Sequence, residues 1–412
     1  MYKKIDKLGF IVSIIFALSI FTSKALQNLS GSILLFLLFV LLVFDFKDKK
    51  VWKSIIIKLE KDLTLALLLF LLISFIVYLI NFDGKFSTAR DMTRYLTFFP
   101  LVYFLDEDSK IKKFILALGI SGTISIFASL IIFVKDFDKW NHTDGVVFYR
   151  ISFGVDPLAY AGIISIFLLF LFSYLFFVRI QKKEKLFIAL LICTGIFILL
   201  VNRGKTAYIS FIPALAYLCI IKSKKSVMVL IGICLVGFNF LPNQIKERAI
   251  YIVQYKKDPS SILRTYFWEG AFESIKTKPI FGYKDLDRQK FLEEYFNKTG
   301  KLNYIHENFG VSLLEVHNTY LQYWVQYGTI AFAYFIFFFF IFIPKKILSI
   351  KVDNTRNLEF VYFLKHAVIA SLISYYISGL TETTLLKQVT IYVFIILLLF
   401  INYINVYLKR NL

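Results

Sequence analysis

Apolar stretches about as long as a lipid bilayer is thick recur along almost the whole chain. A helix needs about 20 residues to cross the hydrocarbon core of a membrane, and most of these stretches come near that length. Of the 412 residues, 58% are hydrophobic, far more than a globular domain of this size needs. The sequence therefore predicts an all-α, polytopic integral membrane protein with about twelve transmembrane helices. The stretches are 8–26, 29–46, 63–81, 91–105, 113–134, 155–178, 186–202, 205–221, 226–241, 319–343, 360–380 and 388–408.

The net charge of +20 does not indicate nucleic-acid binding, because Lys and Arg lie in short clusters between the apolar stretches. These clusters are denser in alternate loops, and short cytoplasmic loops are the ones that are enriched in Lys and Arg. The bias predicts that both termini are cytoplasmic. The start, Met1-Tyr2-Lys3-Lys4 before an apolar stretch without a small-residue cleavage site, predicts an uncleaved first span.

One long polar segment, 242–318, interrupts the apolar pattern between the ninth and tenth stretches. The predicted topology places this segment on the outer side of the membrane. A helix is expected to start at Pro259 and to be ended by Pro279. A second helix is expected over 285–297, with Asp285 as its cap. Two amphipathic helices outside the bundle are suited to cover a cavity in it. One face of the first helix carries Arg264, Trp268, Ala271 and Ile275.

His317 ends this polar segment, directly before the tenth apolar stretch. The free amides and the dipole at the start of a helix disfavour a charged imidazole there. A neutral imidazole accepts a proton, so His317 is a candidate general base. The alternative is that the His-Asn pair is only an interfacial helix cap, with Asn318 as the capping residue.

Arg203 and Arg264 are the candidate anion-binding residues. Arg203 lies in a tight turn between two apolar stretches, and its planar guanidinium suits a bidentate contact with phosphate. The alternative is an arginine that extends to the lipid headgroups, which is also the simpler interpretation of Lys205. Arg264 shares the apolar face of its helix, where an arginine needs an anion. The alternative interpretation of Arg264 is a charged residue on the solvent-exposed surface of an amphipathic helix.

Three further residues are candidates for a supporting role. Arg90 and Arg94 are one helical turn apart, with Asp91 beside them. Either their charges are neutralised locally by Asp91, or the two arginines extend a basic patch. Glu382 is the carboxylate of the last outer loop and is placed to orient a basic residue.

The sequence predicts neither a metal nor a cofactor. Asp285-Leu286-Asp287 has no further carboxylate or histidine spaced as a ligand, so it is weak support for a metal site. A phosphate-binding loop of the Walker type and a dinucleotide-binding glycine motif are both missing from the sequence. We therefore expect a substrate that is already activated, such as a lipid-linked pyrophosphate sugar.

Three blocks of residues resemble the O-antigen ligase and polymerase superfamily of bacterial membrane glycosyltransferases. The first is Asn202-Arg203-Gly204. The second is Arg264 with Trp268, followed by Ala271, Pro279 and Gly282. The third is His317-Asn318, followed by Gly328. The expected topology, with a large loop between the ninth and tenth spans, is similar to that of the family.

The resemblance implies transfer of O-antigen polysaccharide from undecaprenyl pyrophosphate to the lipid A core oligosaccharide, at the periplasmic side of the inner membrane. By this resemblance His317 is the catalytic base, Arg203 and Arg264 bind the pyrophosphate, and Asn318 and Trp268 support the site. The reaction inverts the sugar and needs no metal. The implied partners are the glycan donor, the lipid A core acceptor and membrane lipids. The implied division is spans 1–9 in 1–241, a periplasmic loop with the catalytic motifs in 242–318 and spans 10–12 in 319–412.

Two other functions fit the sequence. An O-antigen polymerase acts on undecaprenyl-linked repeat units and differs in its acceptor. A transporter of lipid-linked oligosaccharides is the third, although transporters place ionisable residues near the bilayer midplane and are built from repeats. Here the charges lie at the outer edge and in one loop.

Overall fold

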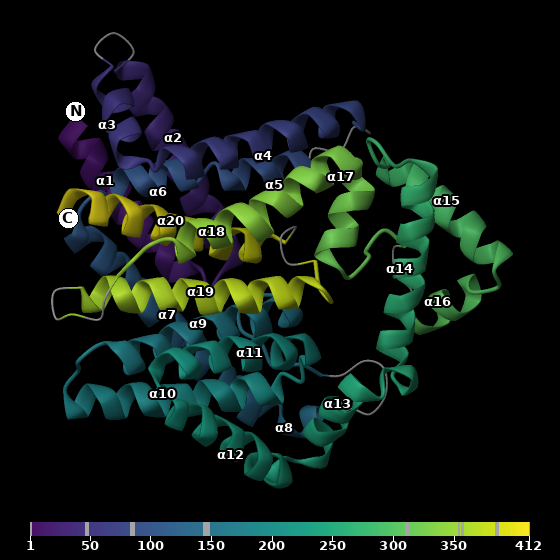
Figure 1. Cartoon of the computed structure of the whole chain (residues 1–412). Helices are drawn as coiled ribbons and strands as arrows, with labels where there is room; N and C mark the ends of the chain where they lie inside the picture. The colour runs from purple at the N-terminus through teal and green to yellow at the C-terminus, as the bar shows by residue number, and fades with distance from the viewer. Residues whose placement is uncertain are drawn as a thin grey trace.

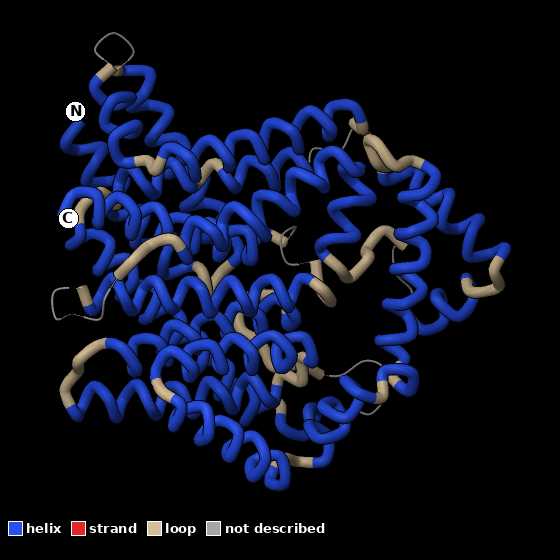
Figure 2. The backbone as a smooth tube through the Cα atoms, viewed as in Figure 1, coloured by secondary structure: helices blue, strands red, loops and turns tan. Residues whose placement is uncertain are grey.

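The computed structural model describes residues 2–45, 49–82, 87–142, 149–309, 313–352, 355, 358–383 and 387–411. Every regular element in these residues is helical (Figure 2), and most of the helices run side by side in one bundle (Figure 1). The two ends of the chain lie at one end of the bundle, and the helices between 242 and 318 lie at the other. The prediction of an all-α fold is confirmed.

Nine helices in the described residues are long and apolar enough to cross a membrane. The polytopic membrane class is thereby confirmed, whereas the expected number of twelve is not. Nine of the twelve predicted stretches overlap these helices: α2 (Lys24–Phe44), α4 (Lys61–Ile80), α7 (Asp108–Lys135), α9 (Pro157–Phe177), α10 (Lys182–Val201), α11 (Lys205–Lys222), α17 (Thr319–Ile336) with its continuation, α19 (Glu359–Gly379) and α20 (Gln388–Asn411).

The other three stretches also form helices, but each differs from those nine in length or composition for a local reason. The first, α1 (Tyr2–Ser19), begins with several charged residues. The fourth is divided into α5 (Ser87–Tyr95) and α6 (Phe98–Phe104). The ninth, α12 (Lys224–Phe240), is one turn short of most spans and has no buried residue. Two short helices complete the bundle: α3 (Lys50–Lys58) and α8 (Phe137–His142).

Helices α19 and α20 form the centre of the bundle. In its most apolar stretch α20 is 83% buried and α19 is 67% buried, whereas α7 is 33% buried. A helix that is apolar on all sides is buried inside a protein or faces lipid on its outer side. The central pair therefore fixes the position of the connection between α19 and α20, which carries Glu382.

The segment 242–318 folds into a layer of helices across the end of the bundle that lies opposite the two termini (Figure 1). Its longest helix, α14, packs in two directions: Ala271 and Ile275 contact the start of α17, and Leu263 and Phe267 contact the next two helices. The two helices predicted in this segment are confirmed. The elements are α13 (Asn243–Val253), a 3-10 turn (Tyr255–Lys257), α14 (Pro259–Thr277), α15 (Asp285–Lys298) and α16 (Leu302–Phe309).

The predicted cap of α15 is wrong by one residue. Lys284 occupies the capping position, and Asp285 is the first residue inside the helix. A carboxylate in the first turn still complements the helix dipole, so Asp285 favours the start of α15 without capping it.

Lys205 holds α14 to the bundle. Its ammonium lies 2.5 Å from a carboxylate oxygen of Asp258, the residue that caps α14, and both side chains are buried. Burial acts to raise the pKa of Asp258, but the hydrogen bonds from Lys205, Ser260 and Ser261 outweigh it and lower this pKa to about 2. The sequence favoured a Lys205 side chain that extends to the lipid headgroups. That interpretation is wrong, because the ammonium group is buried against Asp258.

Helix α17 is interrupted at Gly328, where φ is +71° and ψ is 178°. At this point it crosses the turn after α14: the amide of Tyr283 donates to the carbonyl of Val325 (2.9 Å), and that of Thr329 donates to Pro279 (2.8 Å). A Cβ at Gly328 would lie 2.0 Å from the Ile280 carbonyl oxygen, so only glycine fits. Residues 319–327 thus form a short helix of their own.

His317 is therefore not followed directly by a straight spanning helix. The short helix 319–327 comes first, and the helix that follows Gly328 continues through a π-helical turn (Phe337–Phe342) into α18 (Ile343–Leu348).

Candidate functional site

Three of the predicted side chains come together from three separate segments at the end of the bundle that segment 242–318 covers. Arg264 of α14 donates to Oε1 of Glu382 at 2.9 Å. The other oxygen of the same carboxylate, Oε2, lies 4.0 Å from Nδ1 of His317. Glu382 thus stands between an arginine and the candidate base.

The backbone around His317 is tied to the connection after α19. Asn318 caps α17, since its side-chain oxygen accepts from the amides of Tyr320 and Leu321, and its amide group donates to the Leu380 carbonyl (3.0 Å). The amide and the hydroxyl of Thr319 both donate to the Glu382 carbonyl, at 3.1 and 2.7 Å. The capping interpretation of Asn318 is correct, and the same contacts fix His317 next to Glu382.

Glu382 is buried. Its side chain is 8% exposed, and among the described residues its Oε2 and Nδ1 of His317 have no hydrogen-bond partner. Burial acts to raise the pKa of Glu382, but the facing His317 ring, Arg264 and Lys387 outweigh burial and lower it. A carboxylate that faces Nδ1 orients the imidazole and favours the tautomer whose lone pair is on Nε2.

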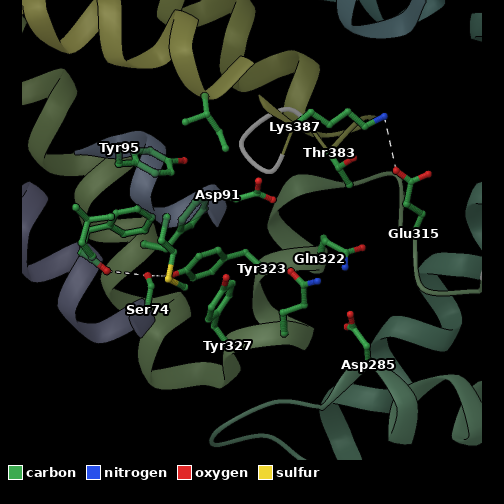
Figure 3. Close-up of a pocket in the computed structure, with 16 residues that line it drawn as sticks. Ser74, Asp91, Tyr95, Asp285, Glu315, Gln322, Tyr323, Tyr327, Thr383 and Lys387 are labelled. Carbon is green, nitrogen blue, oxygen red and sulfur yellow. Dashed lines mark hydrogen bonds and ion pairs between the residues drawn. The ribbon is translucent and has the colours of Figure 1, made fainter. Parts of the chain in front are cut away.

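The opposite edge of the His317 ring faces a second carboxylate. Nε2 lies 3.9 Å from Glu315, and Glu315 lies 3.7 Å from the ammonium of Lys387 (Figure 3). Neither Glu315 nor Lys387 was predicted from the sequence to have a role. Their spacing, two residues before His317 and five after Glu382, was the available signal.

Arg203 is placed differently from Arg264. Its side chain is buried, the guanidinium carbon lies 4.1 Å from the centre of the Trp140 ring, and it donates to the Trp140 carbonyl at 2.9 Å. The turn that holds it is fixed by Asn202, whose amide group donates to Ile151 and Pro157. The predicted contact of Arg203 with pyrophosphate stays a prediction.

Arg150, which the sequence analysis missed, links these two parts of the site. It donates to the Arg203 carbonyl at 3.3 Å and lies in the electrostatic field of both Glu382 and Arg264. Burial and the nearby Arg264 lower the pKa of this guanidinium, and the Glu382 carboxylate opposes the shift. An arginine in an outer loop just before a span was the signal in the sequence.

Backbone strain also marks this region. The non-glycine residues with positive φ in the described part of the chain are Lys49, Arg203 (+59°) and His317 (+50°). Such conformations cost about 1–3 kcal/mol each and tend to occur at functional sites. Two of the three fall on residues that the sequence singled out.

The remaining candidates lie further from His317 or have structural partners. Arg94 is buried, forms an ion pair with Asp91 and donates a hydrogen bond to Gln388, so the charges of Arg94 and Asp91 neutralise each other. Arg90 is exposed. Trp268 packs in the contact between α14 and α17, and its indole nitrogen has no hydrogen-bond partner in the described residues.

The arrangement provides an oriented imidazole beside guanidinium groups, which suits proton removal next to a developing negative charge. Residues 188–336, which include Arg203, Arg264 and His317, match the model of a protein family described as O-antigen ligase. An uncharacterized protein from Haemophilus influenzae strain Rd is 24% identical over 322 residues, which cover 73% of this chain and 75% of that protein.

Proposed function

We propose that this chain is a member of the O-antigen ligase superfamily and that it transfers O-antigen polysaccharide from undecaprenyl pyrophosphate to the lipid A core oligosaccharide, a proposal that the family match over residues 188–336 supports. The observation that carries the proposal is the convergence of Arg264, His317 and Glu382, which are far apart in sequence. A base that is oriented by a carboxylate and flanked by guanidinium groups is what an acceptor hydroxyl and a pyrophosphate leaving group need.

In the proposed reaction the acceptor hydroxyl oxygen forms a bond to the anomeric carbon of the donor sugar. The bond from that carbon to the pyrophosphate oxygen breaks, and its electron pair stays on the pyrophosphate. The hydroxyl proton moves to Nε2 of His317, and Glu382 stabilises the imidazolium that results. A single displacement of this kind inverts the anomeric centre.

Arg264 and Arg150 bind the pyrophosphate in this proposal. Both lie near the one buried carboxylate of Glu382, and together they leave an excess of positive charge for the donor. Arg203 remains a proposed pyrophosphate ligand, and its carbonyl holds Arg150 in place. Hydrogen-bond donors that point at a developing negative charge typically stabilise the transition state by about a few kcal/mol each.

The proposed reaction also implies a location and an orientation in the membrane. We infer that it is a multi-pass protein of the bacterial inner membrane, with cytoplasmic termini and a site that faces the periplasm. The alternation of Lys- and Arg-rich loops supports this orientation. The proposed division into 1–241, 242–318 and 319–412 assigns the catalytic motifs largely to the middle part.

The decisive test is a lipopolysaccharide gel from a strain that lacks the gene, together with extraction of its undecaprenyl-linked glycans. A ligase predicts bare core, with long polymer retained on the lipid carrier. Core capped with a single repeat unit would instead identify a polymerase, and unchanged lipopolysaccharide would reject both functions. A plasmid copy of the intact gene is the control that must restore the parental pattern.

A further inference from the structure

A cavity of about 230 Å³ lies beside the site and has Glu315 in its lining (Figure 3). Glu315 is the carboxylate that faces Nε2 of His317. The walls of the cavity come from α4, α5, the start of α15, the short helix 319–327 and the connection to α20. Its volume is several times the ~30 Å³ of a water molecule and below the roughly 300–1,000 Å³ of pockets for drug-sized ligands. That size suits one sugar ring. We name it the carboxylate cavity.

The carboxylate cavity is lined by three carboxylates, those of Asp91, Asp285 and Glu315, and by one ammonium group, that of Lys387. Figure 3 shows Asp91 on one side of the space and Glu315 and Asp285 on another. An ionised carboxylate only accepts hydrogen bonds, so this lining favours ligands that carry hydroxyl or amino donors and disfavours phosphate. Among the described residues, no group of three such side chains lies close enough to hold a metal ion.

Aromatic rings form the deeper wall of the carboxylate cavity. Tyr323 and Tyr327 stack with their ring centres 4.4 Å apart, and the Tyr323 hydroxyl lies 2.6 Å from that of Ser74. Rings of this kind provide an apolar surface with polar edges. A sugar ring combines an apolar face with a rim of hydroxyl groups, so it matches both parts of the lining.

One buried hydroxyl in the lining has no hydrogen-bond partner among the described residues. Thr383, next to Glu382 in sequence, lines the carboxylate cavity and is 3% exposed. Its Oγ1 makes no hydrogen bond in the described part of the chain. Buried polar groups normally have a partner, so an orphaned hydroxyl in a cavity wall indicates a missing ligand or solvent partner.

We propose that the carboxylate cavity binds a sugar ring of the acceptor glycan that carries no negative charge. This inference rests on the proposed function, because it takes His317 as the base. Glu315 lines the cavity and also faces Nε2, so a ring held there has a hydroxyl on the correct side of the imidazole. The cavity then determines which acceptor is used, whereas the arginines bind the donor.

The test compares two neighbouring carboxylates in the first turn of α15. Asp285 lines the cavity, whereas the Asp287 carboxylate is about half exposed and pairs with Lys278. Both substitutions, Asp285→Asn and Asp287→Asn, remove one charge from the same helix start. Because Asp285 also stabilises the buried guanidinium of Arg288, the thermal unfolding of both variants is measured alongside the assay. The assay uses reconstituted full-length protein, lipid-linked O-antigen as donor and rough lipopolysaccharide as acceptor.

We expect Asp285→Asn to raise the KM for the acceptor about tenfold and to leave the KM for the donor unchanged, because a hydrogen bond to a charged group contributes about that factor. Asp287→Asn should change neither. An unchanged acceptor KM in Asp285→Asn, or a rise in the donor KM instead, would overturn the inference.

A second measurement does not depend on transfer. Gln326→Cys places a thiol in the cavity wall, and Asp287→Cys places one outside it, both in a background in which Cys193, Cys219 and Cys234 are replaced by Ser. Core oligosaccharide freed of lipid should slow maleimide labelling at 326 and not at 287. Labelling that is equally fast with and without it would reject the inference.

The two results separate the inference from the proposed function. Protection of residue 326 without transfer to the core would keep the cavity as a sugar site and reject the ligase function. Transfer without protection, and without a change in acceptor KM, would keep the ligase and reject the cavity. Protection by the free repeat unit alone would support the cavity in a polymerase.

Discussion

The two sides of His317 are lined by different polar groups. On the Nδ1 side, the guanidinium groups of Arg264 and Arg150 lie near the single carboxylate of Glu382. On the Nε2 side, three carboxylates and one lysine line the carboxylate cavity, and one of these carboxylates, Asp91, is paired with Arg94. Guanidinium groups only donate hydrogen bonds, and ionised carboxylates only accept them. A phosphate-bearing donor and a hydroxyl-bearing acceptor can therefore be bound on different sides of one imidazole.

The two sides are also built differently. Arg264, Arg150 and Glu382 come from three segments that meet only through long-range contacts. Much of the carboxylate cavity comes from one short helix, 319–327, which carries Gln322, Tyr323 and Tyr327. A change in that helix should therefore affect the cavity more than the arginines.

The largest effect is expected at the border between the two sides. His317→Ala should lower kcat about 10²–10⁴-fold, the usual contribution of a general base, whatever donor or acceptor is used. Rates of glycan transfer by the reconstituted protein measure this. The control is His306→Ala, an exposed histidine on α16, which should behave as the wild type. A folded, active His317→Ala variant would remove the base from the mechanism.

Gly328→Ala should disturb the cavity side by displacing the short helix. The backbone strain at this position alone costs about 1–3 kcal/mol, and the new Cβ would also collide with the Ile280 carbonyl. Thermal unfolding of the solubilised protein measures the loss of stability. Gly300→Ala is the matched control, because Gly300 has a φ of +70° with open space around it. An equal loss of stability in both variants would show that the close contact of Gly328 with the Ile280 carbonyl contributes nothing to the effect of Gly328→Ala.

Arg264→Lys probes the cationic side. We expect kcat to fall about tenfold, less than the roughly 10²–10³-fold for a donor removed entirely, because lysine keeps the charge and loses the planar fork. The control is Arg179→Lys, an exposed arginine paired with Glu359 on another part of the bundle. If the Arg264→Lys variant transfers glycan at the wild-type rate, a bidentate contact is not required.

The smallest effect is expected from Lys387, which contacts both sides. Lys387 is one of the charges that hold the pKa of Glu382 below its ordinary value. Activity needs the ionised carboxylate and is lost as the pH falls through this pKa, so Lys387→Met should move the acid limb of the pH–rate profile to higher pH. Lys278→Met, at an exposed position on the outer segment, is the control. A shift to lower pH, or none, would contradict this account of Glu382.

Local patterns predicted the parts of the fold that depend on neighbouring residues. The length of the apolar stretches indicated the membrane class, and Pro259 and Pro279 marked the limits of α14 closely. The cap of α15 was misplaced by one residue, because Lys284 and Asp285 are both compatible with a helix start. The kink of α17 was missed, since a glycine inside an apolar stretch also fits a continuous helix.

The sequence by itself determined the identity of the reactive groups. His317 and Glu382 stood out by residue type and by their position next to apolar stretches, and Arg264 stood out on the apolar face of a predicted helix in segment 242–318. Only the tertiary structure decided which of them meet. It brought Glu382 to His317, turned Arg203 onto Trp140, added Arg150 and separated the arginines from the carboxylate cavity. The physical reason is that these contacts join segments more than fifty residues apart. Their geometry follows from how the helices pack against one another, which no local pattern encodes.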